Sequence, residues 1–587
     1  MELNQELGTT EVLWNLDDLY ASPADPAIDR DMEQARALAE KAASYRGRIA
    51  DMNAAEIGAL VSLLEEMDVL VARVATYAML SFTIDTTDAA ASALLQRVSE
   101  LEAELGGKTI FFRLEWNSLA AEQAETILAD PAIDTYRHYL ASLRRFAPYQ
   151  LSTEKEELLQ ELSPVGRLAW NLLFDKVMGQ MRFGEAGRTE EEVLSDLYAR
   201  ERTIRKQAAD EMTQGLQSQL HVLTHVFNTL AAEKMIIDRL RGYPTWLSPM
   251  NLENELEDTI VDTLITAVTS RYGMVHDYYH RKKELLGLDE LYDYDRYAPV
   301  PGQPDIHVSW QECRKIVLES FAGFSPKMAE IAERFFDRGW IHAPILENKR
   351  GGAFAHPCVP DVHPYILVNY TGNLRDVSTV AHELGHGVHQ YLAARQGFYN
   401  ADTPLVLAET ASVFAELLVF KAQLDLLDTE ETRQAFICQK IESIFATVFR
   451  QVAMNRFEDG MHTGRREQGE LSAEQLSGFW LASQKPMFGD SVTLREEYGI
   501  WWAYIPHFLG TPGYVYSYAF GELLVLALYS RYQQEGASFV DKYMELLAAG
   551  GSKSPAELLE PFGISLDDGA FWQGGLDIIE QMVAEVM

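Results

Sequence analysis

Residues 379–386 have the sequence TVAHELGH, in which His382, Glu383 and His386 form a His-Glu-x-x-His pattern. In an α-helix, residues four apart lie on the same face, one turn apart. His382 and His386 would therefore both reach one Zn²⁺ at about 2.0–2.1 Å. Glu383 lies about 100° around the helix from His382, near enough to reach a water molecule on the metal. The pattern thus predicts a metal site on a helix.

The residues on either side predict where this helix begins and ends. Asn373 is a suitable N-cap, and Asp376 in the first turn favours the helix dipole. Gly397 is a suitable end. We therefore predict a helix between Asn373 and Gly397. The same span contains the apolar residues Leu374, Val377, Val380, Ala381, Leu384 and Val388.

A catalytic zinc needs a third protein ligand and an open position for water. The long metalloprotease signature places glycine at position 389 and histidine at position 392, but this chain has His389 and Leu392, which excludes that class. His389 is on the same helix face as His382 but about 10 Å farther along the axis. We expect it to pack or to support the site rather than to bind the metal.

A second helix after the first offers better ligands. Thr403 followed by Pro404 predicts an N-cap and the first helical residue. Glu409 would then lie on the second turn, and antiparallel packing would direct it toward the first helix. Position alone favours Glu409 only slightly over Glu416. Ser412 would share the face of Glu409 and either orient a ligand or simply pack.

Most of the chain is predicted to be helical, because no proline interrupts 27–130, 165–243 or 405–485. The run at 364–370, PYILVNY, is rich in β-branched and aromatic residues and predicts a strand of a small sheet. A chain of 587 residues is too long for one compact core. We place a boundary near residue 200, between an N-terminal helical region, 1–200, and a catalytic region, 201–587.

The composition excludes several partners. Fifty Lys and Arg against 88 Asp and Glu give a net charge of −38, which would repel nucleic acids and anionic membranes. The three cysteines, Cys313, Cys358 and Cys438, are far apart, as is usual in a reducing compartment. The N-terminal sequence MELNQE is unlike a signal peptide, and no run of 18 apolar residues occurs. We expect a cytoplasmic protein with no nucleic-acid or membrane partner.

The segment HELGHGVH at 382–389, followed by Thr403-Pro404 and by Glu409, Ser412 and Glu416, resembles the thimet oligopeptidase-like zinc peptidases, and within them the oligoendopeptidase F branch. The resemblance extends over nearly the whole chain. It also includes WNLDDLY at 14–20, KRGGAF at 349–354, the strand run at 364–370 and WAYIPHF at 502–508.

The resemblance implies that His382, His386 and Glu409 bind one Zn²⁺, which decides between Glu409 and Glu416. It implies that Glu383 is the general base of the reaction. Sequence spacing alone would not have linked His507 to the two histidines, which lie more than 100 positions upstream.

The resemblance further implies that His507 and a tyrosine after it bind the substrate and stabilise the tetrahedral intermediate. The sequence between them is one residue longer than the family pattern. Tyr518 aligns best with the family tyrosine, and Tyr514 is a second candidate. We expect Tyr516 to pack in the interior.

The fold that the resemblance implies is mainly α, a multi-helical ellipsoid of two lobes with a deep substrate channel and a small β-sheet beside the zinc-binding helix. The implied function is zinc-dependent cleavage of internal bonds in short unfolded peptides, by attack of a zinc-bound water with Glu383 as base. The peptide would extend along 364–370 at a sheet edge.

Two other functions remain open. One is a helical zinc carboxypeptidase, which would not cleave a peptide whose C-terminus is blocked as an amide. The other is a catalytically inactive peptide-binding protein of the same fold, which would contain no zinc. The sequence leaves the oligomeric state open between monomer and dimer.

Overall fold

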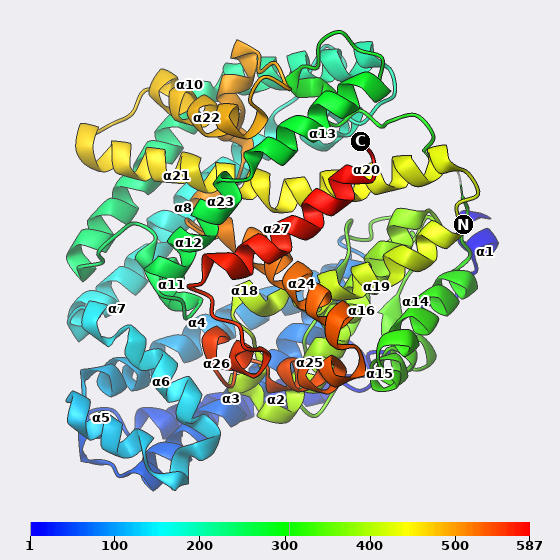
Figure 1. Ribbon diagram of the computed structural model, residues 1–587. Coiled ribbons are helices and arrows are strands. Elements are labelled where there is room, and N and C mark those ends of the chain that lie inside the picture. The colour runs from blue at the N-terminus through cyan, green and yellow to red at the C-terminus, as the bar shows by residue number, and fades with distance from the viewer. Residues whose placement is uncertain (1, 304–305) are drawn as a thin grey trace. The chain divides into compact units, whose positions relative to one another are not determined.

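The structure is a computed structural model that describes residues 2–303 and 306–587, and most of them are helical (Figure 1). The chain divides into two compact units, each made of three separate stretches of sequence. The first contains the described parts of Met1–Gln150, Asp305–Leu426 and Arg531–Ile564. The second contains those of Leu151–Pro304, Leu427–Ser530 and Ser565–Met587. The predicted mainly α fold is confirmed.

The first unit holds one set of helices around its own apolar core. The core is built mostly from the long helices α2, α3 and α4. The helices of this unit are α1 (Glu2–Leu7), α2 (Pro26–Ala43), α3 (Ala54–Ile84), α4 (Ala89–Ser118), α5 (Ala121–Leu128), α6 (Arg137–Arg145), α14 (Trp310–Phe324), α15 (Pro326–Asp337), α16 (Leu374–Ala393), α17 (Phe398–Ala401), α18 (Leu405–Ala408), α19 (Ser412–Asp425), α25 (Ala537–Ala549) and α26 (Pro555–Leu559).

The second unit has a separate core around α10, α21 and the 3₁₀ segment η7 (Glu496–Tyr504). Its helices are α7 (Thr153–Leu162), α8 (Arg167–Gln180), α9 (Glu190–Asp196), α10 (Arg202–Arg241), α11 (Ser248–Glu253), α12 (Asp258–Thr269), α13 (Tyr272–Leu285), α20 (Glu430–Thr447), α21 (Phe449–Gln468), α22 (Ala473–Phe488), α23 (His507–Gly510) and α27 (Gly569–Ala584). The boundary between Ser530 and Arg531 falls inside α24 (Tyr516–Glu535).

The boundary expected near residue 200 coincides with none of these unit boundaries. As a division between an N-terminal and a catalytic region it stays a prediction. Over the described residues, no helix is both long and apolar enough to cross a membrane.

A three-stranded sheet lies in the first unit, with strand order β1-β3-β2. β3 (Tyr365–Leu367) pairs in parallel with β1 (Ile341–His342) and antiparallel with β2 (Phe354–His356), so that Ile366 faces Ile341 on one side and Ala355 on the other. The predicted strand therefore exists, but the prediction that it forms an edge is wrong. All three of its residues are buried, as is usual for a central strand made of consecutive apolar residues. The half-buried β2 is an edge strand instead.

α16 is the predicted His-Glu-x-x-His helix, and it packs against α14, α15, α19 and α25 of the same unit. Asn373 Oδ1 accepts a hydrogen bond from Asp376 N at 3.0 Å, and the Asp376 carboxylate accepts one from Asn373 N at 3.4 Å. The predicted N-cap is thereby confirmed. The α-helix ends at Ala393, and one 3₁₀ turn leads to Gly397, whose φ of 83° suits glycine.

α16 also lies beside the sheet, as expected. Gln390 Nε2 donates a hydrogen bond to the carbonyl oxygen of Ala355 in β2 at 3.2 Å. A Cβ atom added to Gly387 would lie 3.2 Å from the side chain of Ile366 in β3. This close packing places the edge strand β2 next to the helix that carries the two histidines.

Candidate metal centre

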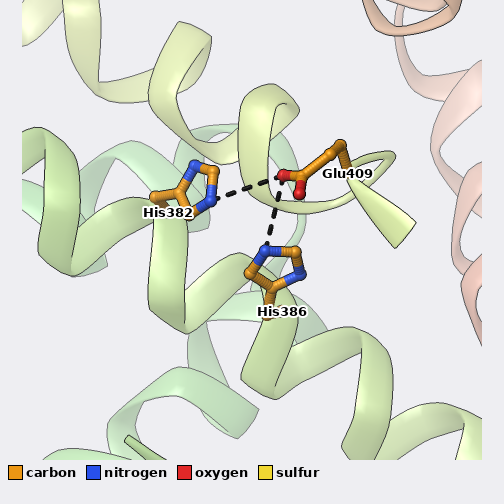
Figure 2. A group of neighbouring side chains, drawn as sticks. All are labelled: His382, His386 and Glu409. Carbon is orange, nitrogen blue, oxygen red and sulfur yellow. Dashed lines mark ion pairs between the residues drawn. The ribbon is translucent and has the colours of Figure 1, made fainter. Parts of the chain in front are cut away.

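His382, His386 and Glu409 converge in the first unit (Figure 2). The Oε2 atom of Glu409 lies 3.4 Å from His382 Nε2 and 3.4 Å from His386 Nε2. One ligand atom from each residue lies within 4.8 Å of the other two. The two imidazole rings are nearly perpendicular, with centroids 4.8 Å apart. The structure therefore brings together the three residues that the family resemblance implies as metal ligands.

The geometry of these three residues fits zinc. Two ligands bound at about 2.05 Å to a tetrahedral ion lie about 3.3 Å apart, close to the observed nitrogen–oxygen separations. Two imidazole nitrogens and one carboxylate oxygen are typical zinc ligands and leave a fourth position open. The side chains of His382, His386 and Glu409 are 27%, 18% and 30% exposed, so a substrate has access to this position.

Glu409 reaches the histidines from a break between two helices rather than from the predicted second turn. The single turn α18 ends at Ala408, and α19 begins at Ser412. Pro404, not Thr403, occupies the N-cap of α18, and no side chain caps it. Pro404 has an extended ψ of 144°, so the helix starts one residue later than predicted, and it ends after one turn at Glu409, where ψ is 0°.

Gly385, between the two histidines, is what lets this break approach α16. A Cβ atom at Gly385 would lie 2.5 Å from the carbonyl oxygen of Ala411 and 2.6 Å from Cα of Ser412. Both are backbone atoms, so no side-chain rotation would relieve the contact. Glycine at this position therefore permits the close packing that brings Glu409 to the histidines.

Glu416 and Ser412 hold the predicted ligands in place. Glu416 Oε1 lies 2.6 Å from His382 Nδ1 and can accept a hydrogen bond from it. This contact leaves the Nε2 lone pair of His382 directed toward Glu409, and such partners orient and strengthen histidine ligands. Ser412 Oγ donates a hydrogen bond to Glu409 Oε2 at 2.6 Å. Glu416 is thus placed as the partner of a histidine, a role that sequence reasoning missed.

The charges around the histidines favour a cation. Burial alone would lower the pKa of His382, but the hydrogen bond that it donates to Glu416 and the charges of the glutamates raise it to about 9. Burial likewise works to raise the pKa of Glu409, whereas its contacts with His386, His382 and Ser412 lower it to about 2. The carboxylates surrounding the imidazoles thus stabilise positive charge at this place.

Glu383 lies beside this group on α16 and is only 6% exposed. Burial raises the pKa of its carboxyl group, although the neighbouring histidines work against the shift. The backbone of Ala355 in β2 also interacts with the Glu383 carboxylate. Glu383 therefore lies between the histidines and the edge strand. His389 is buried, as expected for a packing residue, and burial lowers its pKa to about 3.

His507, Tyr514 and Tyr518 form a second cluster, which belongs to the other compact unit. Tyr518 Oη lies 3.4 Å from His507 Nε2. The ring of Tyr514 is parallel to that of His507 at 6.3 Å and contacts the ring of Tyr518 at 4.8 Å. Both tyrosines are half-buried, whereas Tyr516 is fully buried, as expected. The structure thus leaves both tyrosines beside His507.

Two buried polar residues hold the segment between His507 and Tyr518. Glu458 of α21 accepts a hydrogen bond from Gly513 N at 2.8 Å, and Gly513 has a φ of 87°. Asn254, after α11, donates to Tyr516 Oη at 2.9 Å. Sequence reasoning missed both residues, because each lies at least 55 positions from its partner.

Comparison with known proteins adds independent information. The family model described as peptidase family M3 matches residues 196–578, and the one described as oligopeptidase F matches residues 115–183. The oligopeptidase PepF of Bacillus subtilis is 26% identical over 566 residues, which cover 95% of this chain and 84% of that protein. The group B oligopeptidase PepB of Streptococcus agalactiae is 24% identical over 589 residues, with 98% and 96% covered.

The fold has a solved counterpart. The crystal structure of oligoendopeptidase-F from Enterococcus faecium superposes with a TM-score of 0.73. The match covers 95% of this chain and 98% of that chain at 21% sequence identity. At this identity the likeness concerns the fold alone, and it agrees with a mainly helical chain carrying a small sheet.

Proposed function

This chain belongs to peptidase family M3 and is a metallo-oligopeptidase, and from this premise we propose that it is a zinc-dependent endopeptidase that cleaves internal bonds of short unfolded peptides. The resemblance to the oligoendopeptidase F branch is confirmed. The observation that carries the proposal is the position of Glu409 Oε2, 3.4 Å from the Nε2 atoms of both histidines.

His382, His386 and Glu409 would hold the zinc ion. When bound, zinc supplies a Lewis acid that lowers the pKa of water to about 7. Glu416 and Ser412 would keep the ligands in place through their contacts with His382 and Glu409. These five side chains thus form one half-buried cluster beside α16, in which two would support the three metal ligands.

Glu383 would act as the general base. Its carboxylate accepts a proton from the attacking water and then gives this proton to the leaving amine nitrogen. Burial supports this role, because a carboxyl group with a raised pKa holds the proton between the two steps. The neighbouring histidines and the edge strand β2 keep the carboxylate beside the bond to be cleaved.

His507 with Tyr518 or Tyr514 would stabilise the substrate oxygen that becomes negative during attack. A ring N–H and a phenol O–H are both suitable donors for this purpose. The 3.4 Å contact between His507 and Tyr518 supports their acting as a pair. Tyr514, which contacts both rings, is the second candidate.

The peptide would bind at β2 rather than at the central strand β3. Extended peptides bind sheet edges through backbone hydrogen bonds, which give affinity without side-chain specificity. β2 is an edge strand, and Ala355 within it touches Glu383. A peptide on this strand would thus lie beside the general base.

Several other expectations stay predictions. These are the two-lobed ellipsoid with its deep channel, the cytoplasmic location, the lack of nucleic-acid and membrane partners, and an oligomeric state of monomer or dimer. Family membership indicates short peptides as the substrate class.

The test uses an internally quenched peptide of about ten residues, blocked at both ends, with products identified by mass spectrometry. We expect internal cleavage that a chelator stops and Zn²⁺ restores. Cleavage of only the form with a free C-terminus would favour the carboxypeptidase. Absence of both zinc and cleavage would favour the inactive peptide-binding protein.

A variant tests the general base. Glu383→Gln removes the proton acceptor but keeps the size of the side chain. We expect turnover to fall by at least about 10²-fold, while the protein still binds one zinc ion, as measured by metal analysis. Ordinary turnover by Glu383→Gln would contradict the assignment.

A further inference from the structure

Two arginines of the second unit, Arg296 and Arg450, donate to tyrosine hydroxyl groups rather than to carboxylates. Within 2–303 and 306–587, neither guanidinium forms an ion pair with a carboxylate, and the Nε atom of each is buried without a hydrogen-bond partner. Arg495, by contrast, pairs with Asp210 and Asp293. A guanidinium with a buried, unpartnered Nε and no counter-charge is costly, so the presence of two such groups needs an explanation.

The two arginines meet at the hydroxyl group of Tyr297. Arg296 Nη2 donates to Tyr297 Oη at 2.7 Å, and Arg450 Nη1 donates to the same oxygen at 3.2 Å. With both lone pairs of this oxygen engaged, its own O–H remains as a donor. Tyr297 and Arg450 are half-buried, whereas Arg296 is 5% exposed.

The Arg296 guanidinium is fixed by contacts with two tyrosines. It lies 4.6 Å from the ring centroid of Tyr297 and 5.0 Å from that of Tyr498, and its Nη1 donates to Tyr498 Oη at 3.0 Å. Lys282, which donates to the Arg296 carbonyl oxygen, is itself paired with Glu442. Arg296 therefore supports Tyr297, and Arg450 is the more exposed of the two arginines.

This group lies on the face of α21 that packs, two helical turns farther along, against the residue next to His507. Arg450 and Phe457 are seven residues apart on α21 and so share one face of the helix. The Phe457 ring packs at 4.9 Å against the ring of Phe508, the residue after His507. Burial lowers the pKa of His507, and the positive charge of Arg450 lowers it further.

We propose that Arg450 and Tyr297 bind a carboxylate group of the peptide substrate. A guanidinium and a phenol O–H together match the acceptor oxygens of a carboxylate, and the ligand would supply the counter-charge that the protein omits. The carboxylate could come from the C-terminus of the peptide or from an acidic side chain. The inference rests on the proposed function for the identity of the ligand as a peptide.

The test measures equilibrium binding to zinc-free enzyme by calorimetry, so it does not depend on turnover. The probes are one hexapeptide with a free C-terminus, the same peptide as its amide, and the amide carrying one internal glutamate. Wild-type protein is expected to bind the free acid or the glutamate peptide about tenfold or more tightly than the plain amide. Which of the two is preferred identifies the source of the carboxylate.

Variants then assign the preference to Arg450. R450Q is expected to abolish it, and R450K, which keeps the charge but not the planar fork, to reduce it. The matched control is R456Q, because Arg456 lies on the same helix but pairs with Asp459 at 3.5 Å, and this variant should keep the preference. Circular dichroism verifies that each variant folds.

Equal binding of all three probes by the wild type would overturn the inference, and this comparison needs no variant. So would an R450Q protein that folds and keeps the preference. Absorbance spectra of the wild type and Y297F at neutral pH provide a further check. If the wild type shows a tyrosinate band that Y297F lacks, Tyr297 itself is the counter-ion of the arginines and the inference fails. Failure of the proposed function is seen separately, as absence of zinc-dependent cleavage of the doubly blocked peptide by the wild type.

Discussion

Replacement of Gly385 by alanine tests how the metal centre is assembled. The added Cβ would lie 2.5 Å from the carbonyl oxygen of Ala411 and 2.6 Å from Cα of Ser412, both in the segment that follows Glu409. Ordinary contacts of this kind begin at 3.4 Å, so α16 and this segment would have to separate by roughly 0.9 Å. Glu409 would move with the backbone that carries it.

Two separate effects should follow, one on folding stability and one on zinc affinity. Overpacking against a rigid backbone costs about 1–3 kcal/mol of folding free energy. Displacement of Glu409 also spoils the 3.4 Å spacing to His382 and His386, so we expect zinc affinity to fall by at least about tenfold, as when a ligand loses its supporting contact.

The two effects are measured separately. Urea unfolding of the chelated protein gives the change in stability, and competition with a chromophoric chelator gives the zinc affinity. Gly107→Ala in α4 is the matched control, because its Cβ would meet nothing within 4 Å. A gain of about 0.5–1 kcal/mol is expected there. If Gly385→Ala unfolds and binds zinc like the wild type, the close approach of α16 to the Glu409 segment is not what the structure indicates.

Two further substitutions are informative. Glu416→Gln should lower zinc affinity by about 10–100-fold at unchanged stoichiometry, because the neutral amide orients His382 less strongly, and affinity equal to that of the wild type would contradict this role. Glu458→Gln tests a buried acid: burial raises the pKa of Glu458 from 4.5 to about 8, so the folded protein binds this proton more tightly than the unfolded chain does. Its contribution to stability is present below about pH 4.5 and is lost as pH rises through about 8, by a few kcal/mol in total. The variant keeps an oxygen for Gly513 N but cannot ionise, so its urea midpoint should fall less between about pH 5 and pH 8 than that of the wild type, and parallel curves would refute the assignment.

The local chemistry of the metal-site helix could be predicted from the sequence. The spacing of His382 and His386 places them on one face, and the pairing of Asn373 with Asp376 sets the start of α16. These features depend on residues within a few turns of one another. The choice between Glu409 and Glu416 could not be derived in this way, because it depends on a break in the helix after Ala408. Only the resemblance to a family decided it.

The position of a strand within the sheet is harder to predict from the sequence than the strand itself. The run at 364–370 predicts a strand, and β3 lies within it. Its place in the sheet depends on two partners, β1 and β2, which are too short to give a period-two pattern of their own. A buried apolar run is typical of a central strand, and this signal was available in Tyr365, Ile366 and Leu367. Contacts such as that between Arg450 and Tyr297 join residues 153 positions apart, and no local sequence pattern predicts them.

Because each unit is built from three separate stretches of sequence, the order of synthesis limits when each unit can finish folding. The first unit needs residues 531–564, so it cannot be completed until almost the whole chain has been synthesised. At about 5–20 residues per second, roughly 10–40 seconds pass between the synthesis of the helices of 1–150 and that of Tyr365 and Leu367, which complete their core. During that time the apolar faces that later enclose Tyr365 and Leu367 are open to other chains. The nascent protein should therefore depend on chaperones, and neither unit can be expressed alone as one continuous fragment.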